Sequence, residues 1–302
     1  MISPETVGGT VVETGGGVYR VRLDSGGQVD AALRGRLKLE RRSGDKVVVG
    51  DRVRVARSGE DWVVEGVDPR SSQLLRRGPG GRKAKVVAAN LDAILVVVAA
   101  RDPDPTPSLI DRLLVVAETS GLTPVLVVNK ADLPGGRESA EALRRLYGGI
   151  GYRVLVVSAV SGLGMEALAE QVCTGATALV GPSGAGKSSL LNALDPGLGL
   201  RIGDLSRRTG RGRHTTVSAR LIQLSCGGAV ADTPGFGDVG LWGVAPDEVA
   251  ACFPEMEARV GECRFRGCAH LGEPGCAVRL AVERGEIAPS RYASYRTLRS
   301  EA

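Results

Sequence analysis

The chain has 302 residues, of which 43% are apolar and 3% aromatic, and a formal net charge of +5; this length suggests two or three domains with aliphatic cores. The longest clear apolar run, Ala93–Ala100, is far shorter than the roughly 18 residues of a membrane-spanning helix, and the first residues lack the basic flank and apolar stretch of a signal peptide. These features argue against a helical membrane protein or a secreted one, and they predict a soluble cytoplasmic protein.

The positive charge is concentrated near the N-terminus. Positions 1–85 contain 17 Lys and Arg against 11 Asp and Glu, so the rest of the chain is close to neutral. A basic segment attached to a neutral body favours an anionic partner, of which nucleic acid is the first candidate. The alternative is a solvated, arginine-rich β surface without such a partner.

The first 75 residues are predicted to form a small all-β barrel. In Tyr19–Leu23 and again in Arg52–Val55, apolar residues alternate with arginines, and Trp62–Val67 has the composition of a further strand. Glycine turns separate the strands, and no helical stretch interrupts them. About five short strands arranged in this way are typical of an OB-like or SH3-like barrel.

A change of composition follows the predicted barrel. Arg76–Lys85 is basic and rich in glycine, which predicts a mobile linker over positions 76–89. Positions 90–240 then alternate β-branched runs with helical segments, a pattern typical of an α/β domain with a parallel sheet. The predicted strands are Ala93–Ala100, Val125–Val128 and Val154–Val157, and the predicted helices are Ser108–Thr119 and Glu138–Tyr147.

Two loops that follow predicted strands have the composition of a guanine-binding site. The first is Asn129-Lys130-Ala131-Asp132, in which the carboxylate of Asp132 can accept hydrogen bonds from the guanine imino and amino groups. Adenine would present a ring lone pair to that carboxylate, at a cost of a few kcal/mol. The Lys130 stem can cover the base and Asn129 can hold the loop. The second loop contains Ser158 and Ala159, whose N–H is placed to contact the guanine carbonyl.

A phosphate-binding loop comes later in the chain. Positions 181–188 fit the pattern G-x-x-x-x-G-K-[ST] between a predicted strand and a predicted helix, which is the context the motif requires. Lys187 is placed to contact the β- and γ-phosphates, and the Ser188 hydroxyl is placed to bind Mg²⁺. The residues predicted to surround the phosphates are Gly181, Pro182, Ser183, Gly184, Ala185, Gly186, Lys187, Ser188 and Ser189.

Two further segments complete a nucleotide switch. Asp232 follows a short predicted strand and is placed to bind Mg²⁺ through water, while the N–H of Gly235 can detect the γ-phosphate. Arg208–Val217 is polar and contains glycine, as expected of a mobile loop. Thr215 or Thr216 in that loop can complete the magnesium shell when GTP is present.

The expected catalytic group lies in the same mobile loop. Phe236 occupies the position where many GTPases have the glutamine that orients the attacking water, and phenylalanine cannot form that hydrogen bond. His214 is a candidate replacement, as a general base or as an orienting group. The alternative is a solvated loop histidine with no catalytic role.

The order of these motifs indicates a circular permutation. The base loops precede the phosphate loop, whereas an ordinary GTPase has the phosphate loop first. The same sheet forms from both orders because chain termini lie at the surface and are often close together. The new C-terminal connection leaves directly after the Asp232 loop and runs through Phe236–Trp242 into a cysteine-rich segment. We therefore expect GTP hydrolysis to move that segment.

Positions 241–302 are predicted to form a small helical domain around a metal site. The spacing Cys263-x₄-Cys268-x-His270-x₅-Cys276 supplies three thiolates and one imidazole, a closed tetrahedral set for one structural Zn²⁺. The alternative is a set of ordinary buried cysteines. The sequence suggests no metal role for Cys252, Cys173 or Cys226, and the last two are expected to be core or turn residues.

In this order, the motifs NKAD, SAVSG, GPSGAGKSS, GRHTT and DTPGF, followed by the cysteine cluster, resemble those of the bacterial circularly permuted RsgA/YjeQ GTPases, and the resemblance covers essentially the whole chain. That family implies an OB barrel that contacts ribosomal RNA, a GTPase domain stimulated by the small ribosomal subunit, and a zinc domain that helps to dock on it. By motif match, its catalytic histidine falls on His214 and its switch threonine on Thr216. Its zinc ligands fall on Cys263, Cys268, His270 and Cys276.

The sequence thus predicts a monomeric GTPase that uses GTP, Mg²⁺ and one structural Zn²⁺, binds the small ribosomal subunit and its rRNA late in maturation, and is released on hydrolysis. Two other classes compete with this prediction. A small-molecule P-loop kinase would have a pocket for its acceptor beside the γ-phosphate and would not depend on ribosomes. An RNA-binding module with a purely structural nucleotide site would bind its particle equally in the GTP and GDP states.

Overall fold

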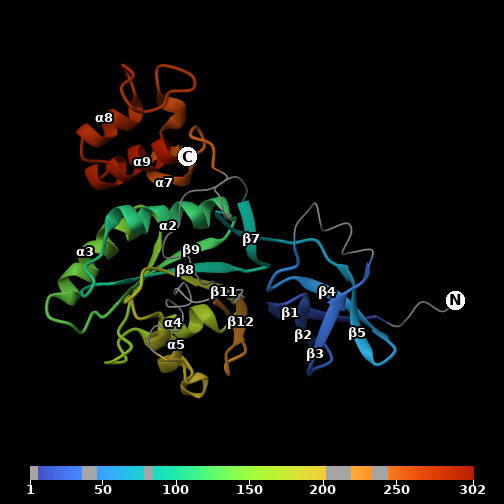
Figure 1. Cartoon of the computed structure of the whole chain (residues 1–302). Helices are drawn as coiled ribbons and strands as arrows, with labels where there is room; N and C mark the ends of the chain where they lie inside the picture. Colours follow the sequence, from blue (N-terminus) through green and yellow to red (C-terminus); the bar gives the residue numbers. More distant parts are fainter. Residues whose placement is uncertain (1–5, 36–45, 78–83, 202–218, 233–243) are drawn as a thin grey trace.

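The computed structural model describes residues 6–35, 46–77, 84–201, 219–232 and 244–302. In this part of the chain, a β-barrel, a central α/β domain and a C-terminal helical module follow one another (Figure 1). No helix in the described ranges has the length and apolar character needed to cross a membrane.

The barrel consists of five strands. β1 pairs with β2, β2 with β3, β3 with β5 and β5 with β4, and a further pairing between β1 and β4 closes the barrel. Alternate residues, among them Val11, Val21, Val55 and Val64, point into a common apolar core, as the alternation in the sequence predicts. The strands are β1 (Val7–Gly15), β2 (Val18–Leu23), β3 (Gln28–Leu33), β4 (Arg52–Ser58) and β5 (Asp61–Val67).

The prediction of a linker over positions 76–89 was wrong at both ends, which belong to strands. Strand β6 (Gln73–Arg77) pairs antiparallel with strand β7 (Ala84–Ala89), and the glycine-rich positions between them lie outside the described residues. Val86, Ala88 and Ala89 are buried, so apolar packing fixes this segment against its neighbours. The stretch was predicted as a linker because of its basic residues and glycines, but its last six residues form a short amphipathic strand.

The central domain has a sheet of six strands in the order β10-β9-β8-β11-β13-β12. All neighbouring pairs are parallel except β12 and β13. This arrangement confirms the parallel sheet predicted from the β-branched runs. The strands are β8 (Ala93–Ala99), β9 (Thr123–Asn129), β10 (Arg153–Val156), β11 (Ala176–Val180), β12 (Arg220–Gln223) and β13 (Ala229–Asp232).

Helices cover both faces of this sheet (Figure 1). α2 (Pro107–Thr119) and α3 (Gly136–Gly148) pack on one face, and α4 (Met165–Val172) and α5 (Lys187–Leu194) pack on the other. A short 3₁₀ helix, η1 (Pro196–Leu198), follows α5. The circular permutation leaves this layered architecture intact.

The sheet continues from the central domain into the barrel. β12 pairs with β1 through Glu13 and Arg220, whose side chains also form an ion pair with 3.0 Å between Arg220 Nε and Glu13 Oε1. The second carboxylate oxygen of Glu13 accepts a hydrogen bond from Arg20. These side chains are partly exposed to solvent. The barrel is therefore attached to the antiparallel edge of the central sheet.

The C-terminal module packs on α2 (Figure 1). Phe253, Met256 and Tyr295 of the module belong to the same buried cluster as Ile110 and Leu114 of α2. The module contains η3 (Val249–Cys252), α7 (Pro254–Glu257), η4 (Val260–Glu262), α8 (Ala277–Glu283) and α9 (Pro289–Glu301).

A buried arginine joins the module to the central domain. Arg291 of α9 donates a hydrogen bond to Asp111 of α2 (2.7 Å) and two to Glu255 of α7 (2.7 and 3.0 Å). Tyr147 of α3 donates to the same oxygen of Asp111 at 2.7 Å. The side chains of Arg291 and Asp111 are 1% and 0% exposed. No pattern in the sequence indicates this network, because its members lie up to 180 residues apart.

Cys173 packs against a core cluster and Cys226 lies in a turn, as expected, but the two also form a disulfide that the sequence did not predict. Cys173 lies at the end of α4, and Cys226 lies in the turn between β12 and β13. They are 53 residues apart in sequence, and the order of the strands brings them together. Cysteine spacing alone does not show such a contact.

Candidate nucleotide and metal sites

The predicted nucleotide-binding loops meet at the carboxyl edge of the parallel strands, where ligands bind in open α/β sheets. The phosphate loop follows β11, the two base loops follow β9 and β10, and Asp232 ends β13. Four separate stretches of the permuted sequence therefore reach one place in the fold.

The phosphate loop needs its glycines because the backbone passes close to its neighbours. Gly181 has a φ of 144°, and a Cβ there would lie 2.0 Å from the carbonyl oxygen of Val97. Gly186 has a φ of 91°, and a Cβ there would lie 2.3 Å from Nδ2 of Asn129. The loop continues directly into α5, whose first residue is Lys187. Its unpaired N–H groups and dipole make this end of the helix suitable for phosphate.

Lys187 lies over the phosphate loop. Its ammonium group donates hydrogen bonds to the carbonyl oxygens of Gly181 and Pro182, each at 2.8 Å, and its side chain is buried. Burial lowers the pKa of Lys187 to about 8, although the nearby carboxylate of Asp232 opposes this effect. A bound polyphosphate would place further negative charge beside the ammonium group and favour its protonated form.

Asn129 connects the first base loop with both the phosphate loop and the second base loop. Its amide nitrogen donates to the carbonyl oxygen of Ala185 at 2.9 Å, and its amide oxygen accepts from the N–H of Ala159 at 3.3 Å. The side chain is almost completely buried. The side chain of Asn129 thus links the first base loop to the phosphate loop and to the second base loop.

The base loop presents a carboxylate to solvent. Oδ1 of Asp132 accepts a hydrogen bond from the Ser158 hydroxyl at 2.6 Å, and that hydroxyl accepts from the N–H groups of Val160 and Ser161. In the described part of the chain Oδ2 of Asp132 has no protein partner. Lys130 has a left-handed φ of 62° and donates to the carbonyl oxygen of Asp102. Asp132 is therefore oriented by Ser158, with an oxygen left for a base.

Of the other residues predicted to bind the nucleotide or Mg²⁺, some lie in the described part of the chain and some do not. Ser188 on α5 and Asp232 at the end of β13 are buried beside the phosphate loop. His214, Thr215, Thr216, Gly235 and Phe236 lie outside the described residues, so the predictions for the catalytic histidine and the switch threonine stay predictions.

The predicted metal ligands lie together in the C-terminal module. One sulfur or nitrogen atom from each of Cys263, Cys268, His270 and Cys276 lies within 4.8 Å of the other three. Nδ1 of His270 is 3.5 Å from the sulfur of Cys263 and 3.4 Å from that of Cys276. Ligands of a tetrahedral Zn²⁺ with ordinary bond lengths are about 3.5 Å apart, so the donor set fits this ion.

Several residues that support the metal-binding loop could not be identified from the sequence. Tyr292 and Tyr295 of α9 donate hydrogen bonds to the carbonyl oxygens of His270 and Ala269, each at 2.7 Å. The carboxylate of Glu273 accepts from three N–H groups of the same loop, which lowers the pKa of Glu273 to about 2. Helix α9 thus positions the loop as well as contacting α2.

Comparison with protein families identifies residues 67–242 as a match to the family model described as RsgA GTPase. The small ribosomal subunit biogenesis GTPase RsgA of Gemmatimonas aurantiaca is 50% identical over 297 residues, which cover 97% of this chain and 96% of that protein. The protein of the same name from Moorella thermoacetica is 43% identical over 295 residues, with coverage of 97% and 96%.

Two solved structures share the fold over nearly the whole chain. The crystal structure of YjeQ from Thermotoga maritima superimposes with a TM-score of 0.82 at 34% identity and covers 98% of both chains. The structure of YloQ, described as a circularly permuted GTPase, has a TM-score of 0.75 at 29% identity and covers 98% of this chain and 95% of its own.

Proposed function

The chain belongs to the RsgA GTPase family and acts as a small ribosomal subunit biogenesis GTPase, and we propose that it docks on the subunit with GTP bound and leaves when GTP is hydrolysed. GTP would occupy the site between Asp132 and Lys187. The observation that supports this proposal best is the double contact of Asn129, which holds the guanine-binding loop against the phosphate loop.

We assign the parts of the site as follows. Asp132 accepts from the guanine imino and amino groups, and Lys187 contacts the β- and γ-phosphates. Ser188 and Thr216 bind Mg²⁺, and His214 orients or deprotonates the attacking water. The supporting observation for the first two is the geometry of their loops, while the others rest on motif matches.

The remaining assignments concern the flanking domains. The barrel, within positions 1–75, would contact ribosomal RNA, and the module at positions 241–302 would hold one structural Zn²⁺ through its Cys₃His set and dock on the subunit. We propose that the protein works as a monomer in the cytoplasm, where it acts late in subunit maturation.

The most direct test compares GTP hydrolysis with and without purified small ribosomal subunits, for the wild type and for His214→Ala. We expect the subunits to accelerate the wild type and to leave His214→Ala slow. An excess of ATP should not displace labelled GTP, because adenine leaves the Asp132 carboxylate without a donor. If the subunits leave the wild-type rate unchanged, or if turnover requires a small-molecule acceptor, the proposed function is wrong.

A further inference from the structure

The cysteines of the chain, all of which lie in its described part, fall into three groups. Three of them belong to the metal cluster. Cys252 is a buried free thiol, and burial raises its pKa to about 11, so it is poorly reactive. Cys173 and Cys226 form a disulfide. Outside the metal cluster, these two residues are therefore the pair that can interconvert between a disulfide and two thiols.

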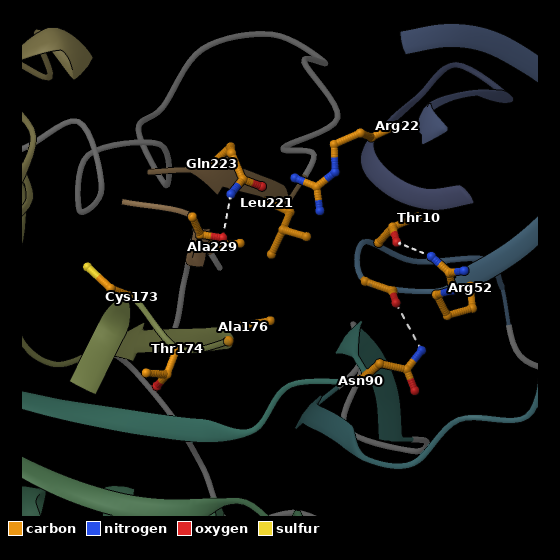
Figure 2. Close-up of a pocket in the computed structure, with 13 residues that line it drawn as sticks. Thr10, Arg22, Arg52, Asn90, Cys173, Thr174, Ala176, Leu221, Gln223 and Ala229 are labelled. Atoms are coloured by element: carbon orange, nitrogen blue, oxygen red, sulfur yellow. Dashed lines mark hydrogen bonds between the residues drawn. The ribbon is translucent and has the colours of Figure 1, made fainter. Parts of the chain in front are cut away.

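The disulfide lies where a small thiol can reach it. Cys226 is exposed in the turn between β12 and β13, and Cys173 is partly exposed at the end of α4. Cys173 and Gly227, the neighbour of Cys226, also line a cavity of about 400 Å³ between the barrel and the central domain (Figure 2). Thiol–disulfide exchange requires access of a thiolate to one of the two sulfur atoms. The exposure of Cys226 makes its sulfur the one that is open to attack.

A reversible disulfide agrees with the cytoplasmic location proposed above. The cytoplasm keeps most thiols reduced, and the disulfides found there are usually transient, catalytic or redox-sensing. Disulfides are needed for folding mainly in small domains that lack a sufficient core. Here two buried apolar clusters lie on the two faces of the central sheet. The core therefore does not require this cross-link, and the chain can fold in its dithiol form.

The disulfide attaches the turn between β12 and β13 to the end of α4. The two segments come so close that a Cβ at Gly228 would lie 1.9 Å from the carbonyl oxygen of Val172. Within the turn, Gln223 donates from Nε2 to the carbonyl oxygen of Gly227 at 2.8 Å (Figure 2). A single hydrogen bond stabilises less than a disulfide does. Loss of the cross-link should therefore loosen the turn, although these hydrogen bonds remain.

The same turn is also attached to the helix that carries the phosphate-binding lysine. Oδ2 of Asp195, which directly follows α5, accepts a hydrogen bond from the N–H of Ser225 at 2.7 Å. Helix α5 begins with Lys187 and Ser188, and β13, which leaves the turn, ends at Asp232. The turn thus connects two elements whose opposite ends reach the nucleotide site.

We propose that Cys173 and Cys226 form a reversible thiol–disulfide site that regulates nucleotide binding, and that the disulfide form binds GTP more tightly. The proposal rests on the function proposed above, because the regulated site is the GTP site. Without the cross-link, the turn and the end of α5 open more often, and the open molecules do not hold Lys187 and Asp232 in place together. A smaller population of binding-competent molecules lowers the apparent affinity by the same factor.

The reaction is an exchange with a low-molecular-weight thiol and consumes two molecules of it. A thiolate attacks the sulfur of Cys226, so that a mixed disulfide forms and Cys173 leaves as a thiolate, which takes up a proton. A second thiolate attacks the sulfur of the bound small thiol, which releases Cys226 and forms the disulfide of the small molecule. The protein gains two electrons and two protons, and the two small thiols lose them. In the reverse reaction, that small disulfide is the oxidant and restores the cross-link.

The test uses the zinc-loaded full chain in mixtures of glutathione and its disulfide. Alkylation and mass spectrometry measure the reduced fraction of Cys173 and Cys226 at a series of glutathione ratios, with and without a saturating non-hydrolysable GTP analogue and Mg²⁺. The affinity for the analogue is measured separately for the oxidised and the reduced chain. The double variant Cys173→Ser, Cys226→Ser represents the reduced form, and Cys252→Ser is the matched control because it removes a thiol outside the pair.

We expect reduction to weaken binding of the GTP analogue about fivefold. A saturating analogue should shift the equilibrium between disulfide and dithiol toward the disulfide by the same factor, because coupled equilibria are reciprocal. The double variant should bind the analogue like the reduced wild type, whatever the glutathione ratio. Cys252→Ser should respond to glutathione like the wild type.

Three results would overturn the inference. If the pair stays oxidised in excess glutathione until the chain unfolds, the disulfide is a permanent structural bond. If the pair stays reduced in excess glutathione disulfide, the two cysteines are not a redox site. If both forms bind the analogue equally and the analogue does not shift the equilibrium, the site does not regulate GTP binding.

The shift caused by the analogue is measured on the wild type alone, so it decides the question even if the double variant does not fold. A chain that binds no GTP analogue in either form refutes the proposed function itself. Failure of the redox proposal and failure of the proposed function are thus distinguished by whether the oxidised wild type binds the analogue.

Discussion

The central domain shares buried apolar side chains with both of its neighbours, Val12 and Val49 on the barrel side and Phe253 and Met256 on the module side, but the charged contacts of the two interfaces differ. On the module side, Arg291 is 1% exposed and contacts two carboxylates. On the barrel side, the ion pair of Glu13 and Arg220 has side chains that are 28% and 47% exposed. The charged contact is therefore buried on the module side and solvated on the barrel side.

This difference changes how a conformational signal can travel. A buried charge is tolerated only when it is paired, so separating the module from α2 would leave Asp111 and Arg291 unpaired in an apolar environment. If GTP hydrolysis moves the module, as the sequence predicts, helix α2 must therefore move together with it. On the barrel side, breaking the ion pair with β12 costs little because both side chains are already solvated, and it is the buried packing of Val12 and Val49 that opposes a shift of the barrel.

Loss of the metal should produce the largest loss of stability among these experiments, and this loss should be confined to the module. Structural Zn²⁺ contributes about 10–16 kcal/mol of apparent binding free energy in small zinc peptides, more than the hydrogen bonds of Tyr292, Tyr295 and Glu273 to the loop at Cys263–Cys276 can supply. Treatment with a chelator should remove one zinc ion per chain, unfold this loop and release Tyr292 and Tyr295 from its carbonyl groups. Hydrogen exchange followed by mass spectrometry would show faster exchange here and unchanged exchange in the barrel.

Cys252→Ser is the control for this experiment. Cys252 is buried in the same module, but its sulfur lies near the carbonyl oxygen of Glu248 and it does not belong to the metal cluster. The variant should keep one zinc ion per chain. Unchanged exchange in the module after the loss of zinc has been verified would mean that the metal does not order it.

Arg291→Met should produce the next largest effect. Removing the guanidinium leaves Asp111 and Glu255 buried without their partner, which typically costs about 3–5 kcal/mol. Urea unfolding of the zinc-loaded protein would measure this loss of stability. Arg296→Ala changes an exposed arginine of the same helix and should cost less than about 0.5 kcal/mol. If both variants lose a similarly small amount of unfolding free energy, the buried charges do not hold the module more firmly than the exposed ion pair holds the barrel.

These features also show what a single sequence can and cannot provide. The P-loop, the base loops and the cysteine cluster were predictable because each is a local pattern whose chemistry requires particular residues at fixed spacing. The parallel sheet was predictable because β-branched runs buried on both faces have no polar alternation. The Arg291 network, the pairing of β1 with β12 and the disulfide between Cys173 and Cys226 depend on contacts between distant segments, and only the folded chain brings these together.

Breaking the disulfide should have an intermediate effect, on the side of the domain to which the barrel is attached. Cys173 and Cys226 close a loop across 53 residues, for which the chain-entropy estimate is about 4 kcal/mol and typical measured values are 2–4 kcal/mol. Reductant should lower the free energy of unfolding of the wild type by about 2–4 kcal/mol. The double variant Cys173→Ser, Cys226→Ser should be equally destabilised and insensitive to reductant. A wild type insensitive to reductant would show that the hairpin of β12 and β13 needs no cross-link.

The smallest effect is expected where the barrel meets β12. Because the ion pair of Glu13 and Arg220 is exposed, a double-mutant cycle with Glu13→Ala and Arg220→Ala should give a coupling energy of only about 0.2–1 kcal/mol, and salt should reduce it further. Urea unfolding at low and high salt would measure both quantities. A coupling energy above about 2 kcal/mol that salt does not reduce would mean that the barrel is held as firmly as the module. In that case a signal from RNA would have to move the barrel and β12 together, rather than change the contact between them.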